Sequence, residues 1–486
     1  QANSVKVLRM NDHLTLFLPC AAGVENWLAD EAAALAAGTA ATVQAQRGGV
    51  RVRGNWHLAL QLNLHSRLAQ RVLVQLAHVP YAREDDLYAA ASTVPWEDWF
   101  GVQQTFKVEV TAQRCPLKSL NFAALRIKDA VADRFRAKAG SRPSVDTHRP
   151  GVRIHAHLDA QHFTLYIDTS GEPLFKRGWR EDKGDAPLKE TLAAAMLVAS
   201  GWQPASGQAL YDPCCGSGTI AIEAAQMACR MAPGRLRRFA FERLLPYRAQ
   251  EWQQLLQAAR AAEVRPEAIC IFGSDVAHRM VDFAQRNAER AGVAHAVQLR
   301  GGDALQRMPP TGEPGILLLN PPYGERIAAA GIAKGSMAPN TPGARGQQAV
   351  PAQRTLALRK GAVAGGREHA IVRTADANGE ADFFVRLASH WKKNYAGWTA
   401  WVLCPDMDLP RRMRLQAARR VPLWNGPIEC RLFRFDLVAG QLDKTRQAAD
   451  KAQQPPGVEE SQTPTGAAAK GSAPCSAKCS TQGAVP

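Results

Sequence analysis

The sequence has 486 residues, 46% of them hydrophobic, with a formal net charge of +16 and a pI near 9.6. This length exceeds one ordinary domain and predicts two or three, each with a sizeable apolar core. It contains no apolar run of about 18 residues and no apolar stretch near its start, so we expect neither a membrane span nor a signal peptide. The basic charge indicates a polyanionic partner, either a nucleic acid or an acidic membrane surface.

The ten cysteines do not form a disulfide pattern, because most of them are scattered in apolar surroundings. Cys475 and Cys479 lie in a low-complexity stretch with no His nearby, which argues against a zinc site. We therefore predict no metal site and a reducing, cytoplasmic location. The sequence identifies no protein partner.

Residues 1–55 are predicted to form a small α/β unit. The apolar run Leu14 to Leu18 and the alternating run Gly49 to Arg53 are typical of strands, and Gly23 to Ala37 has apolar residues at helical spacing. Helical periodicity resumes from Trp56 to Leu76.

Residues 56–170 are predicted to form a second, basic unit. It contains strands at Thr105 to Val110, Val152 to Leu158 and His162 to Asp168, and a helix from Leu120 to Lys138. Residues 101–153 hold eleven Lys and Arg against four Asp and Glu, an excess of +7 that favours a phosphate-binding surface over a merely solvated helix face. The residues predicted to bind RNA are Lys107, Arg126, Lys128, Arg134 and Lys138.

Residues 171–440 open with an amphipathic helix from Asp185 to Gly201 and then alternate strands with helices, which predicts a doubly wound parallel sheet. The predicted strands are Ala209–Tyr211, Ile269–Gly273, Val297–Leu299, Ile316–Leu319 and Thr399–Leu403, with a closing pair near Val421 and at Glu429–Phe435. Residues 328–378 and 441–486 are rich in Ala, Gly, Pro and Gln. We predict a disordered insertion and a disordered tail there.

A glycine-rich turn follows the first predicted strand of this sheet, within Tyr211 to Ala221. It also fits a dinucleotide-binding pattern, but an NAD site needs an acid about 20 residues further on, and the next acid at a strand end is Asp275. The longer gap favours S-adenosylmethionine (SAM). Asp275 would then bind the ribose hydroxyls and Asp303 the adenine amine, although a lone Asp is as often a turn or helix cap. The predicted cofactor-binding residues are Asp212, Pro213, Gly216, Gly218, Thr219, Asp275 and Asp303.

The run Asn320, Pro321, Pro322 and Tyr323 follows the fourth predicted strand and is the candidate catalytic motif. The Asn320 side-chain oxygen and the Pro321 carbonyl could accept both hydrogens of an exocyclic base amine, and Tyr323 could stack on that base. Alignment, not a strong general base, would carry the rate. The alternative is a proline-rich turn with a buried tyrosine.

With these motifs in hand, the sequence resembles the THUMP-domain RNA guanine-N2 methyltransferases. From Leu14 to Phe435 it is similar to the guanine-N2 half of the fused 23S rRNA methyltransferases of bacteria. The likeness includes Phe175 to Arg180, Ala186 to Thr191, Gly48 to Gly54, Ile127 to Val131 and Asn425 to Ile428.

The resemblance implies an α/β chain in which a ferredoxin-like unit and an α+β THUMP RNA-binding domain precede a Rossmann-like methyltransferase domain. It also implies SAM-dependent methylation of the exocyclic N2 of a guanine in 23S rRNA. The half that makes 7-methylguanine has no counterpart in this sequence, and 328–378 is an insertion relative to the family. The alternatives are a tRNA guanine-N2 or adenine-N6 methyltransferase, an RNA-binding protein without catalysis, and an NAD oxidoreductase.

Overall fold

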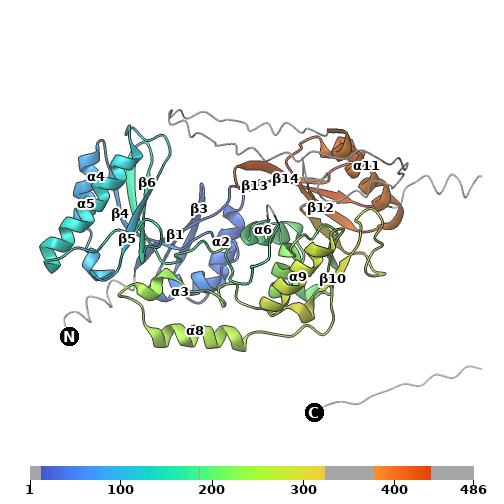
Figure 1. Cartoon of the computed structure of the whole chain (residues 1–486), viewed down its shortest axis with the longest axis horizontal. Coiled ribbons are helices and arrows are strands. Elements are labelled where there is room, and N and C mark those ends of the chain that lie inside the picture. The colour runs from blue at the N-terminus through green and yellow to red at the C-terminus, as the bar shows by residue number, and fades with distance from the viewer. Residues whose placement is uncertain (1–12, 185–186, 323–376, 439–486) are drawn as a thin grey trace, which may run out of the picture. The chain divides into compact units, whose positions relative to one another are not determined.

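The computed structural model describes residues 13–184, 187–322 and 377–438 of the chain (Figure 1). These residues form two seven-stranded sheets with helices packed against them. No helix in these ranges is both long enough and apolar enough to cross a membrane.

The first sheet has the strand order β2-β3-β1-β4-β7-β6-β5. Its strands are β1 (Leu14–Pro19), β2 (Thr42–Gln46), β3 (Gly49–Gly54), β4 (Leu73–Pro80), β5 (Phe106–Ala112), β6 (Val152–Leu158) and β7 (His162–Asp168). Its helices are α2 (Glu25–Leu35), α3 (Trp56–His65), α4 (Glu84–Thr93) and α5 (Leu120–Ala139). Because β1 pairs with β4, through Leu16 opposite Val74, one sheet runs through both predicted N-terminal units.

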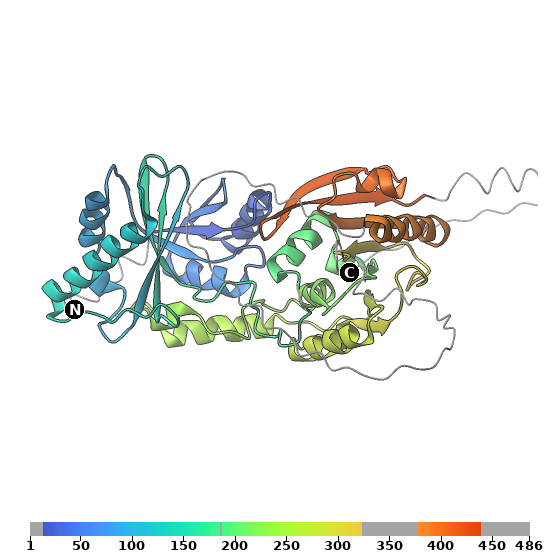
Figure 2. The ribbon, with the colours of Figure 1, turned by 45° about the horizontal axis from the view of Figure 1, so that its top comes forward.

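The second sheet has the strand order β10-β9-β8-β11-β12-β14-β13, and β14 runs antiparallel to both its neighbours. Strands β10, β12, β13 and β14 are labelled in Figure 1, and Figure 2 shows the same ribbon turned by 45°. Its strands are β8 (Leu210–Asp212), β9 (Ile271–Asp275), β10 (Gln298–Gly301), β11 (Ile316–Leu319), β12 (Thr399–Cys404), β13 (Arg419–Asn425) and β14 (Ile428–Asp436). Its helices are α6 (Glu190–Ser200), α7 (Thr219–Ala228), α8 (Ala249–Ala261), α9 (His278–Arg290), α11 (Ala377–Asn394) and α12 (Leu409–Met413). The predicted strands of this sheet are confirmed to within two residues.

Alternate residues of the second sheet feed two separate apolar cores. In β11, Ile316 and Leu318 lie in a core with Ile220 of α7, whereas Leu317 and Leu319 lie in a core with Phe384 of α11. Successive side chains of a strand point to opposite faces, so helices cover this sheet on both sides. The continuous apolar run Ile316–Leu319 is what such a strand requires.

Two predicted helices differ from the structure. The helix expected from Trp56 to Leu76 ends at His65, and its last residues belong to strand β4. The carboxylate of Glu31 accepts hydrogen bonds from the Ser66 hydroxyl and the Arg67 amide, which fixes the turn that ends the helix. The helix expected from Asp185 begins at Glu190, and Asp185 lies outside the described residues.

Strand β2 and helices α4 and α8 were not predicted from the sequence. The predicted insertion 328–378 lies outside the described residues except for its last two, which begin α11. The predicted tail 441–486 lies wholly outside them.

A buried charge cluster joins the N-terminal part of the chain to helix α7. Glu223 of α7 is fully buried and accepts from Arg67 at 3.2 Å and from Arg177 at 3.0 Å. Arg177 is itself only 1% exposed. Removing one partner of such a cluster leaves the others buried without a counter-charge.

We therefore expect Glu223→Gln to lower the free energy of unfolding by about 3–5 kcal/mol, because both guanidinium groups lose their ion-pair partner. Urea titration measures this change. Glu263→Gln is the matched control, since Glu263 forms a looser pair with Arg235 at 3.7 Å and is 23% exposed. Its loss should stay below about 1 kcal/mol. Equal losses in the two variants would rule out a special role for the buried cluster.

Candidate functional site at the carboxyl edge of the second sheet

The loop between β8 and α7 requires glycine at two positions. Gly216 and Gly218 have φ of +53° and +85°, a region that side chains with a Cβ avoid. A Cβ on Gly218 would also lie 3.0 Å from the Cβ of Ala284 on α9. The loop thus packs closely on a neighbouring helix and leads into α7 at Thr219, and the N-cap Gly218 has no side chain to cap the first backbone N–H groups. The N-terminus of a helix is a favourable place for a polar or negatively charged ligand group.

The three predicted acids lie at the ends of the three neighbouring strands β8, β9 and β10. Asp212 is 2% exposed and accepts from the Cys214 amide at 3.0 Å, with Pro213 buried between them. Asp275 accepts from the amides of Gly216, at 3.0 Å, and Ala277, at 2.9 Å. Asp303 accepts from the Leu305 amide at 2.9 Å.

All three acids lie close enough to the Cys214 thiol to shift its pKa. Burial raises the pKa of Cys214 well above its usual value, and the negative charges of Asp212, Asp275 and Asp303 raise it further. The acids predicted to bind the cofactor are therefore gathered around the glycine loop. As turn residues they also cap local N–H groups, so the two interpretations of each Asp are compatible.

Burial also perturbs the acids themselves. It raises the pKa of Asp212 from 3.8 to about 8, while the Cys214 amide lowers it and the charge of Asp275 raises it. The pKa of Asp275 is likewise raised by burial, against two amide hydrogen bonds that lower it. Such an edge favours a ligand that brings hydrogen-bond donors or positive charge.

Asn320 follows β11, which lies beside β8 in the sheet with Leu317 opposite Tyr211. Its Oδ1 atom is buried and has no hydrogen-bond partner among the described residues. Pro321 is buried and Pro322 is half-buried, so the backbone here is tightly held. Tyr323 lies outside the described residues. A buried acceptor without a donor is costly, and an amine hydrogen would satisfy it.

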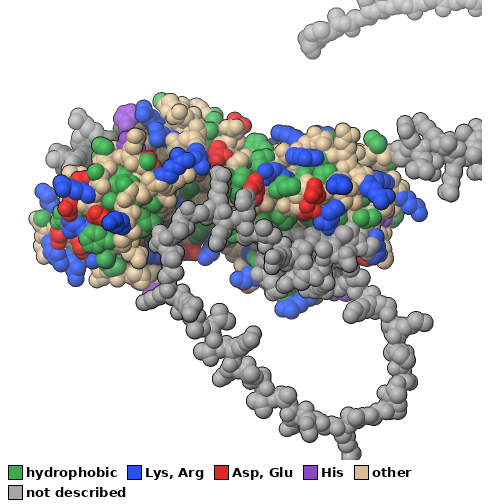
Figure 3. Space-filling model, turned by 90° about the horizontal axis from the view of Figure 1, so that it is seen from above, with side chains coloured by type: hydrophobic (Ala, Val, Ile, Leu, Met, Phe, Trp, Pro, Cys, Tyr) green, Lys and Arg blue, Asp and Glu red, His purple; other side chains and the backbone are tan. Residues whose placement is uncertain are grey.

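Four of the five residues predicted to bind RNA are already engaged in ion pairs. The pairs are Lys107 with Glu109, Arg126 with Asp85, Lys128 with Asp129, and Arg134 with Glu97, at 2.9, 2.6, 2.8 and 2.7 Å. On the face drawn in Figure 3, Lys and Arg side chains likewise lie among acidic ones. Only Lys138 of the five is exposed and has no ion pair within the described ranges.

Sequence reasoning gave no role to Arg180, although its motif was part of the resemblance. Its guanidinium donates to the hydroxyls of Ser217, at 3.2 Å, and Thr219, at 2.8 Å, on either side of Gly218. The only signal in the sequence is the short run Arg177 to Arg180, which no spacing rule connects to a loop some 40 residues later.

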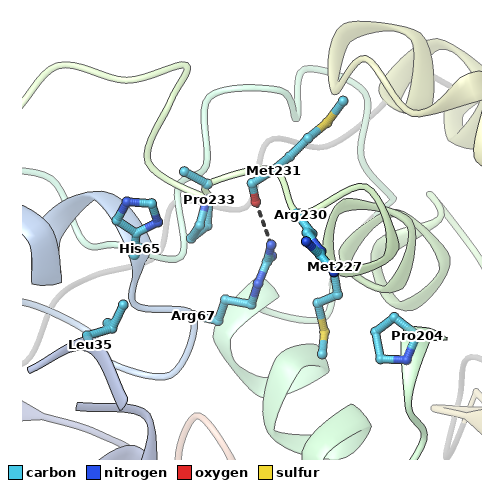
Figure 4. A pocket seen from close by; sticks show the side chains of 9 residues that line it. Leu35, His65, Arg67, Pro204, Met227, Arg230, Met231 and Pro233 are labelled. Atoms are coloured by element: carbon cyan, nitrogen blue, oxygen red, sulfur yellow. Dashed lines mark hydrogen bonds between the residues drawn. The ribbon is translucent and has the colours of Figure 1, made fainter. Parts of the chain in front are cut away.

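Two cavities, of about 320 and 410 Å³, lie away from this edge. The first is lined by His65, Arg67 and Arg230 together with apolar side chains, and Arg67 donates to the Met231 carbonyl at 2.6 Å there (Figure 4). The second lies against β10 and α9. Neither cavity is lined by a predicted site residue.

Three stretches of the chain match known domain families. Residues 15–73 match the RlmL ferredoxin-like domain, residues 81–168 the THUMP domain, and residues 177–339 the RMKL-like methyltransferase domain. The resemblance and the fold class predicted from the sequence are thereby confirmed. The domain boundaries given there stay a prediction.

Relatives support the same assignment. The chain is 35% identical over 397 residues to the ribosomal RNA large subunit methyltransferase K/L of Psychromonas ingrahamii, covering 81% of this chain and 46% of that protein. It is 34% identical over 441 residues to the protein of the same name from Pseudomonas aeruginosa, covering 89% and 54%. The chain thus spans about half the length of the curated relatives it matches.

Two solved structures share the fold. A predicted N6-adenine-specific DNA methylase from Listeria monocytogenes superposes with a TM-score of 0.70 at 24% identity, covering 87% of this chain and 96% of that one. TrmN from Thermus thermophilus gives a TM-score of 0.58 at 19% identity, covering 88% and 100%. At these identities the likeness concerns the fold alone.

The raised pKa of Asp212 predicts how stability changes with pH. Between pH 3.8 and about 8 the folded protein holds a proton on Asp212 that the unfolded chain releases. The free energy of unfolding of the ligand-free protein should therefore fall as pH rises through this window. Asp212→Asn removes this titration, so urea titrations at pH 5 and pH 8 (roughly the ends of the window) should differ less in this variant than in the parent.

Asp275 contributes a slope of the same sign, so part of the pH dependence should remain in Asp212→Asn. Glu313→Gln, at an exposed position between β10 and β11, is the control and should keep the parent's pH dependence. An unchanged slope in Asp212→Asn would mean that Asp212 is ionised in the folded protein.

Proposed function

We propose that this chain, which carries an RlmL-type ferredoxin-like domain, a THUMP domain and an RMKL-like methyltransferase domain, methylates the exocyclic N2 of a guanine in 23S rRNA. The observation that carries the proposal is the buried Oδ1 of Asn320, which has no hydrogen-bond partner among the residues that the structure describes. Asn320 follows β11, which lies beside β8, the strand that leads into the glycine loop. A base amine bound at Asn320 would therefore lie near a methyl donor bound at that loop. Both the relatives' names and this chemistry favour an amine of RNA as the target.

The methyl donor is SAM, held by the glycine loop and the three acids. Residues that suit it are present: buried carboxylates that favour donors, and a glycine turn whose positive φ other residues rarely adopt. Asp275 would accept from the ribose hydroxyls and Asp303 from the adenine amine, while Thr219 and the α7 N-terminus face the polar end. Bound there, SAM supplies a methyl group on a sulfonium, which needs no activation by a metal.

Asn320 and Pro321 would align the nucleophile. The lone pair of an exocyclic amine is delocalised into the ring. Accepting both amine hydrogens, at Asn320 Oδ1 and the Pro321 carbonyl, holds the nitrogen with its lone pair toward the methyl group. The amine proton becomes acidic as nitrogen is alkylated, so no strong base is required. Pro322 stiffens the loop, and Tyr323 is proposed to stack on the base.

The RNA-binding part would be the N-terminal sheet with its THUMP domain. A ribosomal RNA substrate also favours a cytoplasmic location. The eight described cysteines are free thiols, which is compatible with that location. Among the basic residues, the exposed and unpaired ones are better placed to contact phosphates than those held in ion pairs, because a paired cation must first break its pair.

The test is methyl transfer from labelled SAM to RNA isolated from a strain lacking the gene. We expect label in 23S rRNA, recovered as N2-methylguanine after nuclease digestion, and none in tRNA. Label in tRNA or in N6-methyladenine would replace the proposed substrate by one of the alternatives. Absence of label in every RNA, with cofactor binding retained, would favour an RNA-binding protein without catalysis.

Asn320→Ala should reduce the rate of methyl transfer by at least about 100-fold, because the amine loses the group that orients it. The Kd for S-adenosylhomocysteine (SAH), measured by calorimetry, should change by no more than a few-fold. Asn320→Asp keeps an acceptor oxygen at the Oδ1 position and should retain more activity than the alanine variant. Near-normal turnover of the Asn320→Ala variant would show that Asn320 does not orient the amine.

Lys118→Glu and Lys138→Glu should each weaken RNA binding and reduce the slope of log affinity against log salt by about 1, since each loses a phosphate contact. Both lysines are exposed and unpaired within the described ranges. Arg134→Glu should instead lower the melting temperature, because Arg134 holds Glu97 and the Ser92 carbonyl. Affinity and salt slope unchanged in both lysine variants would place RNA recognition elsewhere.

A further inference from the structure

The segment between the two sheets fits closely against the methyltransferase domain. Trp179 is fully buried, and Gly178 has φ of +97° with room for no side chain, because a Cβ there would lie 2.7 Å from the Leu236 carbonyl oxygen. This packing fixes the backbone, and with it the positions from which the Arg177 and Arg180 side chains extend.

Arg180 uses its guanidinium to join three pieces of the chain. Besides the hydroxyls of Ser217 and Thr219, it donates to Glu190 Oε1 at 2.9 Å and to the Leu188 carbonyl at 3.1 Å. The side chain is 11% exposed, and Glu190 at the start of α6 offsets its charge. The contacts span Nε and both terminal nitrogens, a planar fork that lysine cannot reproduce.

We propose that Arg180 is a positioning residue that holds the glycine loop in the conformation that takes the cofactor. Ser217 and Thr219 flank Gly218, whose φ of +85° has to be kept against a flexible backbone. One rigid group bound to both hydroxyls fixes their separation and with it the turn. Asn287, fully buried, supports the same loop from α9 by donating to the Ser217 carbonyl at 3.1 Å. The inference rests on the proposed function, since it assumes that this loop binds SAM.

Arg177 provides a matched comparison three residues earlier. It is more deeply buried, with 1% of its side chain exposed against 11% for Arg180, and it donates to Glu223, the Leu174 carbonyl and the Arg67 carbonyl. Within the described residues it makes no hydrogen bond to the glycine loop. If Arg180 had a purely structural role, Arg180→Lys and Arg177→Lys should act alike, and both should change only the stability of the protein. A positioning role predicts that only the change at Arg180 acts on the cofactor.

The experiment measures the Kd for SAH by calorimetry and the melting temperature of the full chain carrying Arg180→Lys or Arg177→Lys. We expect Arg180→Lys to raise the Kd by about 10-fold, the scale of one lost charge-assisted hydrogen bond. Arg177→Lys should lower the melting temperature and leave the Kd within about two-fold of the parent. In steady-state assays, the KM for SAM should rise in Arg180→Lys more than kcat falls.

Ser217→Ala, a milder change, keeps the test decisive if Arg180→Lys folds poorly. It should raise the Kd for SAH, and combining it with Arg180→Lys should give less than the product of the two effects, because both remove the same contact. An unchanged Kd in Ser217→Ala and Arg180→Lys, or equal effects at Arg177 and Arg180, would overturn the proposal. The parent chain's own SAH binding and methyl transfer report separately on the proposed function.

Discussion

Strands β8 and β11 are neighbours in the second sheet, yet the helices that follow them pack on opposite faces. Helix α7, after β8, contributes Ile220 to one core, and α11, after β11, contributes Phe384 to the other. Between two such strands the carboxyl edge of a sheet is left open, and ligands of doubly wound folds bind there. The glycine loop and Asn320 follow these two strands, so strand order, and not any single residue, brings the proposed cofactor loop and the proposed amine-binding residue to one edge of the sheet.

The opening is also where the chain departs from what stability alone would favour. A carboxyl with a pKa raised to about 8 is unfavourable in a folded core, and so is the Asn320 amide oxygen, which has no donor among the described residues. The positive φ of Gly216 and Gly218 adds backbone strain for any other residue at these positions. Arg180 and the buried Asn287 donate hydrogen bonds to the residues around Gly218. We interpret these contacts as the support that keeps the strained turn in place.

The second sheet could be predicted from the sequence because its strands are short apolar runs followed by acids or by Asn320, and a buried parallel strand needs little else. The helix expected from Trp56 to Leu76 was wrong because apolar spacing continues past its end, whereas the stop depends on Glu31, a residue from another helix. Contacts of this kind are invisible to a pattern. The same holds for Arg180, whose partners lie beside it only after folding.

Charge counting located a basic unit, but four of the five side chains that it selected are held in ion pairs. Arg126 and Arg134 pair with Asp85 and Glu97, which lie outside the counted stretch, so these acids offset part of its excess positive charge. The basic side chains of the stretch that remain exposed and unpaired within the described ranges are Arg114, Lys118, Lys138, Arg142 and Arg149. The first two precede α5 and the others lie at or beyond its last turn. A helix of 20 residues is about 30 Å long. The free cations thus form two groups too far apart for one phosphate, and an RNA that meets both has to run along the helix.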